Sequence, residues 1–371
     1  MDPPPKPEDD TPSVLENIPA EVFSEILDRC DYPSIQSLRK TSSKIREFID
    51  TALPKCSILK LLITILLDTV ILQIHVSNSD LPYPAGGLLY LTYKKDKENG
   101  ARISSNFRKS EIQIPGENFE ILAISDFLEI LKFQGKNLEV LEILEIHQES
   151  GNSNSKFLEI LAGKDLKIPA KTLKMKVWNS TDILKILKVL NPQFLKKLVL
   201  ERPKNLEEFH IFLGLLENEN WRKNEQWMAL EELESPDYQF SYDVRDYLHL
   251  KRVNTELSVI SWRNMDTLKE NILSAGPEKH FRLNYNHFHD RDQFPRHFGA
   301  HLKDDDENAF FFYRTNKDEQ LMKMSIFGNF IEFKWISPHE MPLEGLPFIQ
   351  EYQIPEKKDY WKLLRDLRYI F

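Results

Sequence analysis

Residues 18–50, IPAEVFSEILDRCDYPSIQSLRKTSSKIREFID, decide how the start of the chain folds, because their pattern predicts three short helices. Asn17 is a favourable N-cap for the first helix, and Pro19 suits its first position. Apolar residues then follow at helical spacing on one face: Val22, Phe23, Ile26 and Leu27. A unit of about forty residues buries only a marginal core. We therefore expect it to need a partner or the rest of the chain, as an adaptor-docking module does.

The second and third helices follow from local breaks in the same stretch. Asp31-Tyr32-Pro33 restarts the chain, and Ile35 and Leu38 provide the apolar side of a second helix. Ser42 or Ser43 opens the third helix, which carries its own apolar positions: Ile45, Phe48 and Ile49.

This pattern resembles the F-box. The matching residues are Ile18-Pro19, Glu21, Ile26-Leu27, Leu38-Arg39-Lys40 and Lys44-Ile45-Arg46. SLRKTSSKIREFID is especially similar to the F-box of the nematode F-box A family, which carries an FTH domain downstream. The resemblance implies docking to a Skp-type adaptor and, through it, to a cullin. Ile18 stands where the family usually has Leu and Ile45 where many members have Trp, but both keep apolar bulk, so we expect docking to be retained.

Composition excludes several classes of function. The 371 residues carry a net charge of −9, which disfavours a nucleic-acid partner. Cys30 and Cys56 are too few for a disulfide framework or a four-cysteine zinc site. MDPPPKPEDD is acidic and proline-rich, the opposite of a signal peptide, and we read residues 1–13 as a disordered tail. We expect a protein of the cytosol or nucleus.

The most apolar stretch, residues 58–76, raises the question of a membrane span. A span needs about twenty apolar residues with few charges, but Asp68 lies near the centre of this stretch. Asp68-Thr69 instead predicts a break between two strands, ILKLLITILL and VILQIHV. LLYLTY predicts a further strand, and Asn99-Gly100 is a typical hairpin dipeptide. We therefore expect an F-box at residues 14–51, followed by a β-rich connector at residues 52–117. We expect no membrane partner.

From about residue 118 the chain becomes repetitive. FLEIL at 127–131 recurs at 157–161, and looser echoes are ILKIL at 183–187 and FLGLL at 212–216, each in a helical stretch. Strand patterns follow at 138–143, 173–177 and 195–200, with weaker ones at 230–233, 257–259 and 281–285. Units of one helix and one strand must stack to bury their apolar faces. The alternative is a conventional α/β domain whose units resemble each other by chance.

A second resemblance begins at residue 168. IPAKTLKMKVWNSTDILKILKVLNPQFLKKLVL is similar to the opening of the FTH domain, and LKENIL and FFFYR…LMKM…IEFKWI keep that domain's order of parts. The expected fold is therefore α/β (α+β): a three-helix F-box followed by a leucine-rich-repeat-like curved array of helix–strand units. We place the array at 118–345, with a strand meander at 310–313, 323–327 and 330–336, and a C-terminal capping helix at 346–371.

No catalytic or cofactor motif is present. The sequence has no phosphate-binding glycine loop and no nucleophile elbow. One group of metal-ligating residue types occurs: His287, His289, Asp290, Asp292, His297 and His301. Its spacing matches no metalloenzyme signature, so we read it as a solvated loop. We expect no cofactor, no metal and no catalysis.

We therefore expect the substrate-recognition subunit of a Skp–cullin–F-box ubiquitin ligase. The alternative is a scaffold that binds partners without delivering ubiquitin. The expected adaptor-binding residues are Ile18, Pro19, Val22, Ile26, Leu27 and Leu38. The target protein is unknown; its expected contacts, on strand positions facing away from the helices, are Glu142, Lys174, Lys176, Trp178, Val199 and Glu234. Trp178 is an expected hot spot, although packing between repeats explains it equally well.

Overall fold

The computed structural model describes residues 18–30, 32–54, 58–76, 88–96, 100–106, 110–134, 138–145, 156–176, 180–201, 211–212, 224–239, 243–290, 293–306, 308–315 and 319–352. The chain divides into two compact units, Met1–Lys171 (unit 1) and Thr172–Phe371 (unit 2). The fold is mixed α/β, with N-terminal helices followed by strands in both parallel and antiparallel pairing.

Unit 1 begins with the three predicted helices. They are α1 (Ala20–Asp28), α2 (Tyr32–Leu38) and α3 (Ser43–Ala52). The predicted cap of α3 is confirmed, since the Ser42 hydroxyl accepts the Ile45 N–H at 3.2 Å. Asn17 lies outside the described residues, and α1 begins directly after Pro19. The small core between the helices is wholly apolar: Phe23, Leu27, Tyr32, Ile35, Ile45 and Ile49.

The apolar stretch at 58–76 is a β-hairpin, as predicted. β1 (Ile58–Leu66) pairs antiparallel with β2 (Thr69–Val76), and the exposed Leu67 and Asp68 form the turn between them. Alternate residues of both strands are buried, which explains the high apolar content without a membrane. Among the described residues, no helix is both long and apolar enough to cross a bilayer.

The remaining strands of unit 1 extend this hairpin on both sides. They are β3 (Leu88–Lys95), β4 (Ala101–Ser105), β5 (Ile112–Ile114) and β6 (Leu138–Glu145). The order is β6-β1-β2-β3-β4-β5, and only the β1–β6 pairing is parallel among these neighbours. Gly100, just before β4, has to be glycine because a Cβ atom there would lie 2.7 Å from the Ile114 carbonyl oxygen.

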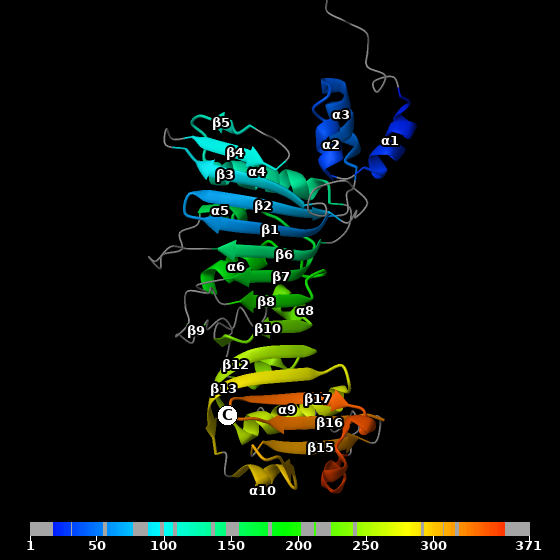
Figure 1. Cartoon of the computed structure of the whole chain (residues 1–371), viewed down its shortest axis with the longest axis vertical. Coiled ribbons are helices and arrows are strands. Elements are labelled where there is room, and N and C mark those ends of the chain that lie inside the picture. The colour runs from blue at the N-terminus through cyan, green and yellow to red at the C-terminus, as the bar shows by residue number, and fades with distance from the viewer. Residues whose placement is uncertain are drawn as a thin grey trace, which may run out of the picture. The chain divides into compact units, whose positions relative to one another are not determined.

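Two helices complete unit 1. α4 (Phe119–Lys132) lies against β2 and β3, and α5 (Lys156–Ala162) packs beside it (Figure 1). The buried Tyr93 hydroxyl of β3 donates to the Asp126 carboxylate of α4 at 2.5 Å. Burial of the phenol, together with this carboxylate, raises the pKa of Tyr93. The Phe157 N–H donates to Glu120 Oε1 at 3.1 Å and joins α5 to α4.

Unit 2 begins as an alternation of strands and helices. In chain order these are β7 (Ala170–Lys176), α6 (Ser180–Lys188), β8 (Lys197–Glu201), α8 (Glu225–Ala229), β10 (Glu232–Ser235), η3 (Val244–Tyr247), β12 (Arg252–Ser261), α9 (Trp262–Ala275) and β13 (His280–His289). The strands β7, β8, β10, β12 and β13 are parallel and adjacent in that order. The patterns predicted at 257–259 and 281–285 lie wholly within β12 and β13, and β7 contains the described part of 173–177. β8 and β10 each begin two residues later than the patterns predicted at 195–200 and 230–233.

The predicted helical echoes hold for three of the four segments. Residues 127–131, 157–161 and 183–187 lie in α4, α5 and α6. The fourth prediction, 212–216, is wrong where the structure describes it. Phe212 belongs to β9 (Ile211–Phe212), which pairs in parallel with β11 (Tyr238–Gln239). Pairing with a strand distant in sequence overrides the local helical pattern here; residues 213–216 lie outside the described residues.

The C-terminal part of unit 2 is the predicted meander. β15 (Ala309–Thr315), β16 (Leu321–Ile326) and β17 (Phe330–Ile336) are antiparallel neighbours, and β17 joins β13. The other elements here are α10 (Phe294–Phe298), β14 (Leu302–Lys303), η5 (Pro338–Glu340), η6 (Leu343–Phe348) and β18 (Ile349–Tyr352), which pairs with β15. Of the predicted capping helix, residues 353–371 lie outside the described residues.

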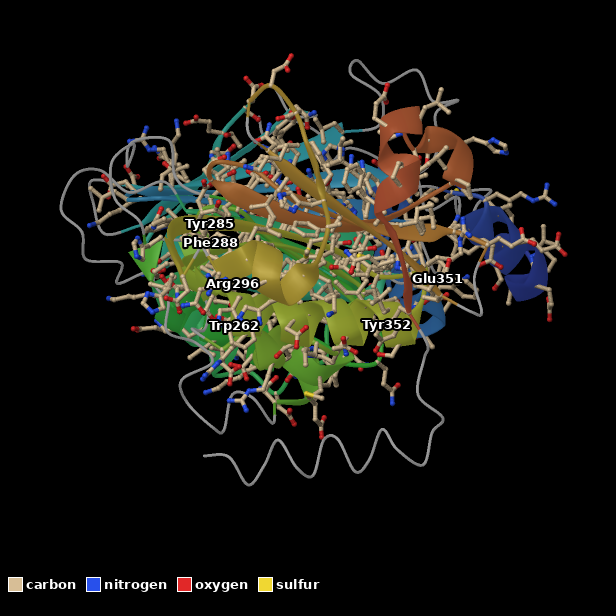
Figure 2. All side chains as sticks on the ribbon, turned by 90° about the horizontal axis from the view of Figure 1, so that it is seen from below. Trp262, Tyr285, Phe288, Arg296, Glu351 and Tyr352 are labelled. Carbon is tan, nitrogen blue, oxygen red and sulfur yellow. The ribbon has the colours of Figure 1, made fainter. Side chains whose placement is uncertain are left out.

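In unit 2, α9 lies on one side of the strands, and η5 and η6 lie on the other side at the β15 end (Figure 2). The Trp262 ring at the start of α9 stacks on the His297 ring of α10, with 3.7 Å between the ring centroids. Figure 2 labels Trp262 and Arg296, the residue before His297. On the side of η5 and η6, Met341 packs in a buried apolar cluster with Phe312 and Leu321.

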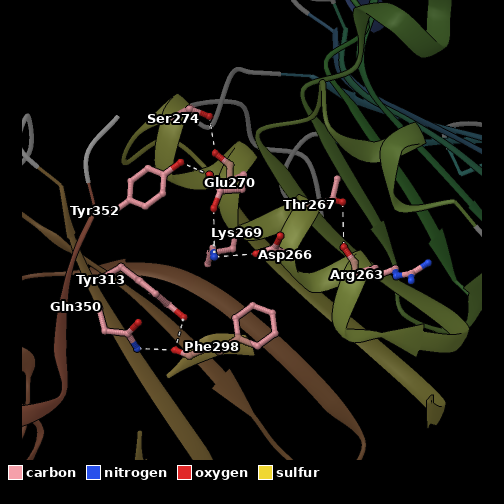
Figure 3. A network of polar contacts seen from close by, with 10 residues as sticks. All are labelled: Arg263, Asp266, Thr267, Lys269, Glu270, Ser274, Phe298, Tyr313, Gln350 and Tyr352. Carbon is pink, nitrogen blue, oxygen red and sulfur yellow. Dashed lines mark hydrogen bonds and ion pairs between the residues drawn. The ribbon is translucent and has the colours of Figure 1, made fainter. Parts of the chain in front are cut away.

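A polar network ties α9 to the meander (Figure 3). Lys269 pairs with Asp266 at 2.8 Å and with Glu270 at 3.2 Å. Its ammonium lies 5.3 Å from the Phe298 ring centroid and 5.7 Å from that of Tyr313. The Tyr352 hydroxyl of β18 donates to Glu270.

Candidate functional site

Helix α1 carries an apolar stripe that faces outward. Val22 is 49% exposed and Ile26 is 39% exposed, and the exposed Pro19 precedes them on the same side of the helix. Phe23 and Leu27, on the neighbouring face, point into the three-helix core. Apolar side chains at positions 19, 22 and 26 of so small a unit form a continuous surface of the kind that binds another protein.

The structure separates the predicted adaptor-binding residues into groups. Pro19, Val22 and Ile26 lie together on this outer stripe, whereas Ile18 and Leu38 are half-buried. Leu27 is only 1% exposed and is part of the core. Helical periodicity alone did not distinguish the inner face of α1 from the outer one, because both are apolar.

The three-helix unit is held on α4 by a contact that local sequence patterns do not reveal. Arg39, after α2, pairs with Asp50 of α3 at 2.7 Å and with Glu129 of α4 at 3.4 Å. Its guanidinium lies 5.5 Å from the ring centroid of the buried Phe133, against which the Tyr32 ring packs edge-on at 5.9 Å. Glu129 and Phe133 lie some ninety residues after Arg39 in the chain, so no spacing rule predicts these two contacts.

Unit 2 presents a second candidate surface, which we name the open face. Strand alternation sends Leu198, Leu233, Val253 and Phe281 to the buried side. The opposite positions form the open face: Lys174, Lys176, Lys197, Val199, Glu201, Glu232, Glu234, Arg252, Asn254, Glu256, His280, Arg282, Asn284, Phe330, Glu332, Lys334, Lys323 and Ser325.

Charges of opposite sign alternate across the first strands of the open face. Lys174 and Lys176 of β7 reach Glu201 of β8 at 2.6 and 3.6 Å. Lys197 of β8 reaches Glu234 of β10 at 2.8 Å. Partial burial opposes ionisation of Glu201, but the two lysines hold its pKa below the usual range. The hydrogen bond to Glu234 raises the pKa of Lys197.

Four of the predicted target-binding residues lie on the open face. Lys174, Lys176 and Glu234 contribute to the ion pairs just described. Val199 lies among them but is mostly buried. This part of the open face is therefore a row of paired charges with little apolar area.

The remaining two predicted residues lie elsewhere. Glu142 belongs to β6 of unit 1, is only 6% exposed and forms an ion pair with Lys60 of β1. The parallel β1–β6 register brings the two side chains together, and sequence alternation alone cannot show that pairing. Trp178 lies outside the described residues.

The histidine-rich segment has ordinary packing roles where it is described. The His297 ring stacks on Trp262, and the His301 ring lies 5.0 Å from Phe311. His289 reaches its neighbour Asp290 at 3.3 Å. Within the described ranges, no three His, Cys, Asp or Glu side chains are grouped so that they could hold a metal ion; Asp292 is not among those residues.

Comparison with known families finds two domains in the chain. A model of the F-box domain matches residues 15–57, which contain α1 to α3 and the outer stripe. The chain therefore contains an F-box domain. A model of the FTH domain matches residues 151–300, and an F-box followed by an FTH domain is the combination typical of nematode F-box A proteins. No curated protein matches the chain.

The F-box carries a general implication for function. It implies binding to the Skp adaptor and the role of substrate adaptor in a Skp–cullin–F-box ubiquitin ligase. F-box proteins are generally non-catalytic ligase adaptors.

Proposed function

We propose that this protein is the substrate-recognition subunit of a Skp–cullin–F-box ubiquitin ligase and that Pro19, Val22 and Ile26 form the centre of its adaptor-binding surface. The exposed apolar stripe on α1 of the matched F-box is the observation that carries this proposal. Ile18 and Leu38 border the surface, and Leu27 supports it from inside. Burying Val22 and Ile26 against an apolar partner would remove their side chains from water, which is favourable.

The mechanism needs no catalytic residue in this chain. A target held by unit 2 while the F-box holds the adaptor would be kept near the ubiquitin-charged enzyme of the complex. Tethering raises the effective concentration of the target's lysine at the reacting centre, and this is the catalytic contribution of an adaptor.

For the target we propose the open face of unit 2. The succession of five adjacent parallel strands, with helices between them in the chain, supports a leucine-rich-repeat-like array in which this face binds the partner. Lys174, Lys176 and Glu234 supply both charge signs, and Trp178, which lies outside the described residues, is the aromatic contact that the sequence pattern predicts. Val199 and Glu142 are the least accessible of the predicted contacts.

The adaptor surface is tested with the double variant Val22→Asp/Ile26→Asp. Both side chains are exposed, so the free protein should stay folded, while two charges would have to be desolvated in the complex. We expect the affinity for a purified Skp-type adaptor to fall at least about a hundredfold, on the order of 3 kcal/mol. Isothermal titration with the full chain measures it.

Leu67→Asp is the matched control, because it makes the same kind of change at an exposed aliphatic residue in the β1–β2 turn. It should leave adaptor affinity unchanged. Full adaptor binding by the double variant would refute the proposed surface. In a reconstituted ligase, adaptor binding without any ubiquitin transfer to a bound target would support a non-degradative scaffold instead.

A further inference from the structure

The open face ends in a row of three half-buried phenylalanines with a cation at each end. The rings of Phe310 and Phe327 are 6.0 Å apart, and those of Phe327 and Phe330 stack at 4.1 Å. The Lys323 ammonium lies 4.5 Å from the Phe310 centroid, and the Arg282 guanidinium lies 4.0 Å from that of Phe330. We name these five residues the cation–aromatic strip.

Positive charge at the strip is under-compensated. Lys323 and Lys334 are direct cross-strand partners on β16 and β17, an arrangement of like charges that destabilises a sheet. Glu332 is a carboxylate near the strip, and it lies 3.1 Å from His280 and 3.8 Å from Lys334. Among the described residues, no carboxylate comes within ion-pair distance of Lys323 or Arg282. Burial, then repulsion from Lys334, lowers the pKa of Lys323.

This composition differs from the rest of the open face and of the chain. The first strands carry cations matched by glutamates, and the whole sequence has a net charge of −9. At the strip, three cations surround one carboxylate beside an aromatic row. Aromatic residues and arginine are the groups enriched at binding hot spots. An anion between the members of an opposed lysine pair would offset their repulsion and accept charge-assisted hydrogen bonds.

We propose that the cation–aromatic strip, with Lys334, binds an acidic segment of the target protein. An apolar side chain of that segment would pack on Phe327 and Phe330, while carboxylate or phosphate groups would contact Lys323 and Lys334 at one end of the strip and Arg282 at the other. This assignment rests on the proposed function, which supplies the target, and it specifies the chemistry by which the target is recognised. An anion there offsets the lysine–lysine repulsion that the free protein carries.

The test uses three pools of short fluorescent peptides that differ only in a fixed central residue: glutamate, phosphoserine or glutamine. Anisotropy titrations with the full chain should show the glutamate pool, the phosphoserine pool or both binding about tenfold more tightly than the glutamine pool, with a preference that weakens as salt rises. Binding of the phosphoserine pool alone would identify phosphate as the anion, and binding of both would identify any acidic group.

The variants Lys323→Glu and Arg282→Glu should abolish that preference, whereas Lys188→Glu, at an exposed lysine of α6, should keep it. Lys323→Glu also places opposite charges across β16 and β17, so its melting temperature should equal or exceed that of the wild type. Lost binding in a variant of undiminished stability is therefore not explained by unfolding. Equal binding of all three pools, or unchanged preference in Lys323→Glu, would overturn the proposal. Adaptor binding is measured separately and is unaffected by either result.

Discussion

Lys279 is a buried cation without a carboxylate partner among the described residues. Its ammonium donates to the Leu248 carbonyl oxygen and, at 3.0 Å, to Asn271 Oδ1, and it lies 5.6 Å from the Phe281 ring centroid. Burial lowers the pKa of Lys279 from 10.5 to about 8. The side chain thus joins η3, α9 and β13 through neutral acceptors, at the cost of keeping a charge away from water.

This residue makes stability depend on pH. The unfolded chain keeps a proton on Lys279 up to its ordinary pKa, whereas the folded chain releases it near pH 8. Between these values the unfolded state binds more protons, so the free energy of unfolding rises with pH, on the order of 3 kcal/mol in total. Urea unfolding of wild type and Lys279→Met at pH 7.5 and pH 10 isolates this contribution. The wild type should gain stability relative to the variant, and parallel pH profiles would contradict the assignment.

Helix α9 is joined to the neighbouring elements by the long side chain of Lys269. Lys269 lies between the rings of Phe298 and Tyr313 while pairing with Asp266 and Glu270 (Figure 3). The aliphatic stem provides packing and the ammonium provides charge, and two substitutions separate these contributions.

Lys269→Ala should lower the free energy of unfolding by about 2 kcal/mol, because it removes both packing and charge interactions. Lys269→Met should cost less, since a methionine still packs between two aromatic rings. Thr267→Ala is the control: its exposed hydroxyl donates only to the Arg263 carbonyl oxygen within α9, so the change should stay within about 0.5 kcal/mol. Chemical denaturation measures all three, and an equal loss in the Ala and Met variants would show that packing contributes little.

At the scale of the whole chain, we expect the small core of the F-box to depend on its contact with α4 of the same unit. Phe133, after α4, is buried beneath Tyr32 and Arg39. Phe133→Ala should destabilise unit 1 by about 3–5 kcal/mol through the cavity it leaves. It should also raise amide hydrogen exchange in α2 and not only in α4.

Amide hydrogen exchange, measured by mass spectrometry, distinguishes an F-box that depends on α4 from one that folds independently. Phe330→Ala, a half-buried phenylalanine of unit 2, is the control and should leave exchange in α2 unchanged. If Phe133→Ala raised exchange in α4 while α2 kept its protection, the F-box would fold without the support of α4.

Local patterns in the sequence determined much of the architecture. As predicted, α2 begins at Tyr32, Ser42 caps α3, and the exposed turn at Asp68 separates β1 from β2. The F-box motif between residues 18 and 46 also pointed to the family that the domain match shows. These features are readable because capping, turn formation and amphipathic periodicity each depend on residues only a few positions apart.

Only the tertiary structure decided which residues meet across distant parts of the chain. Ile26 and Leu27 are adjacent apolar residues on α1, yet packing of the three helices buries Leu27 and leaves Ile26 exposed. Phe212 is a strand residue because β11 pairs with it. Lys323 and Lys334 face each other because the β16–β17 hairpin sets their register. Burial and strand pairing are properties of the partner as much as of the residue, and the partner's position is set by the folded chain.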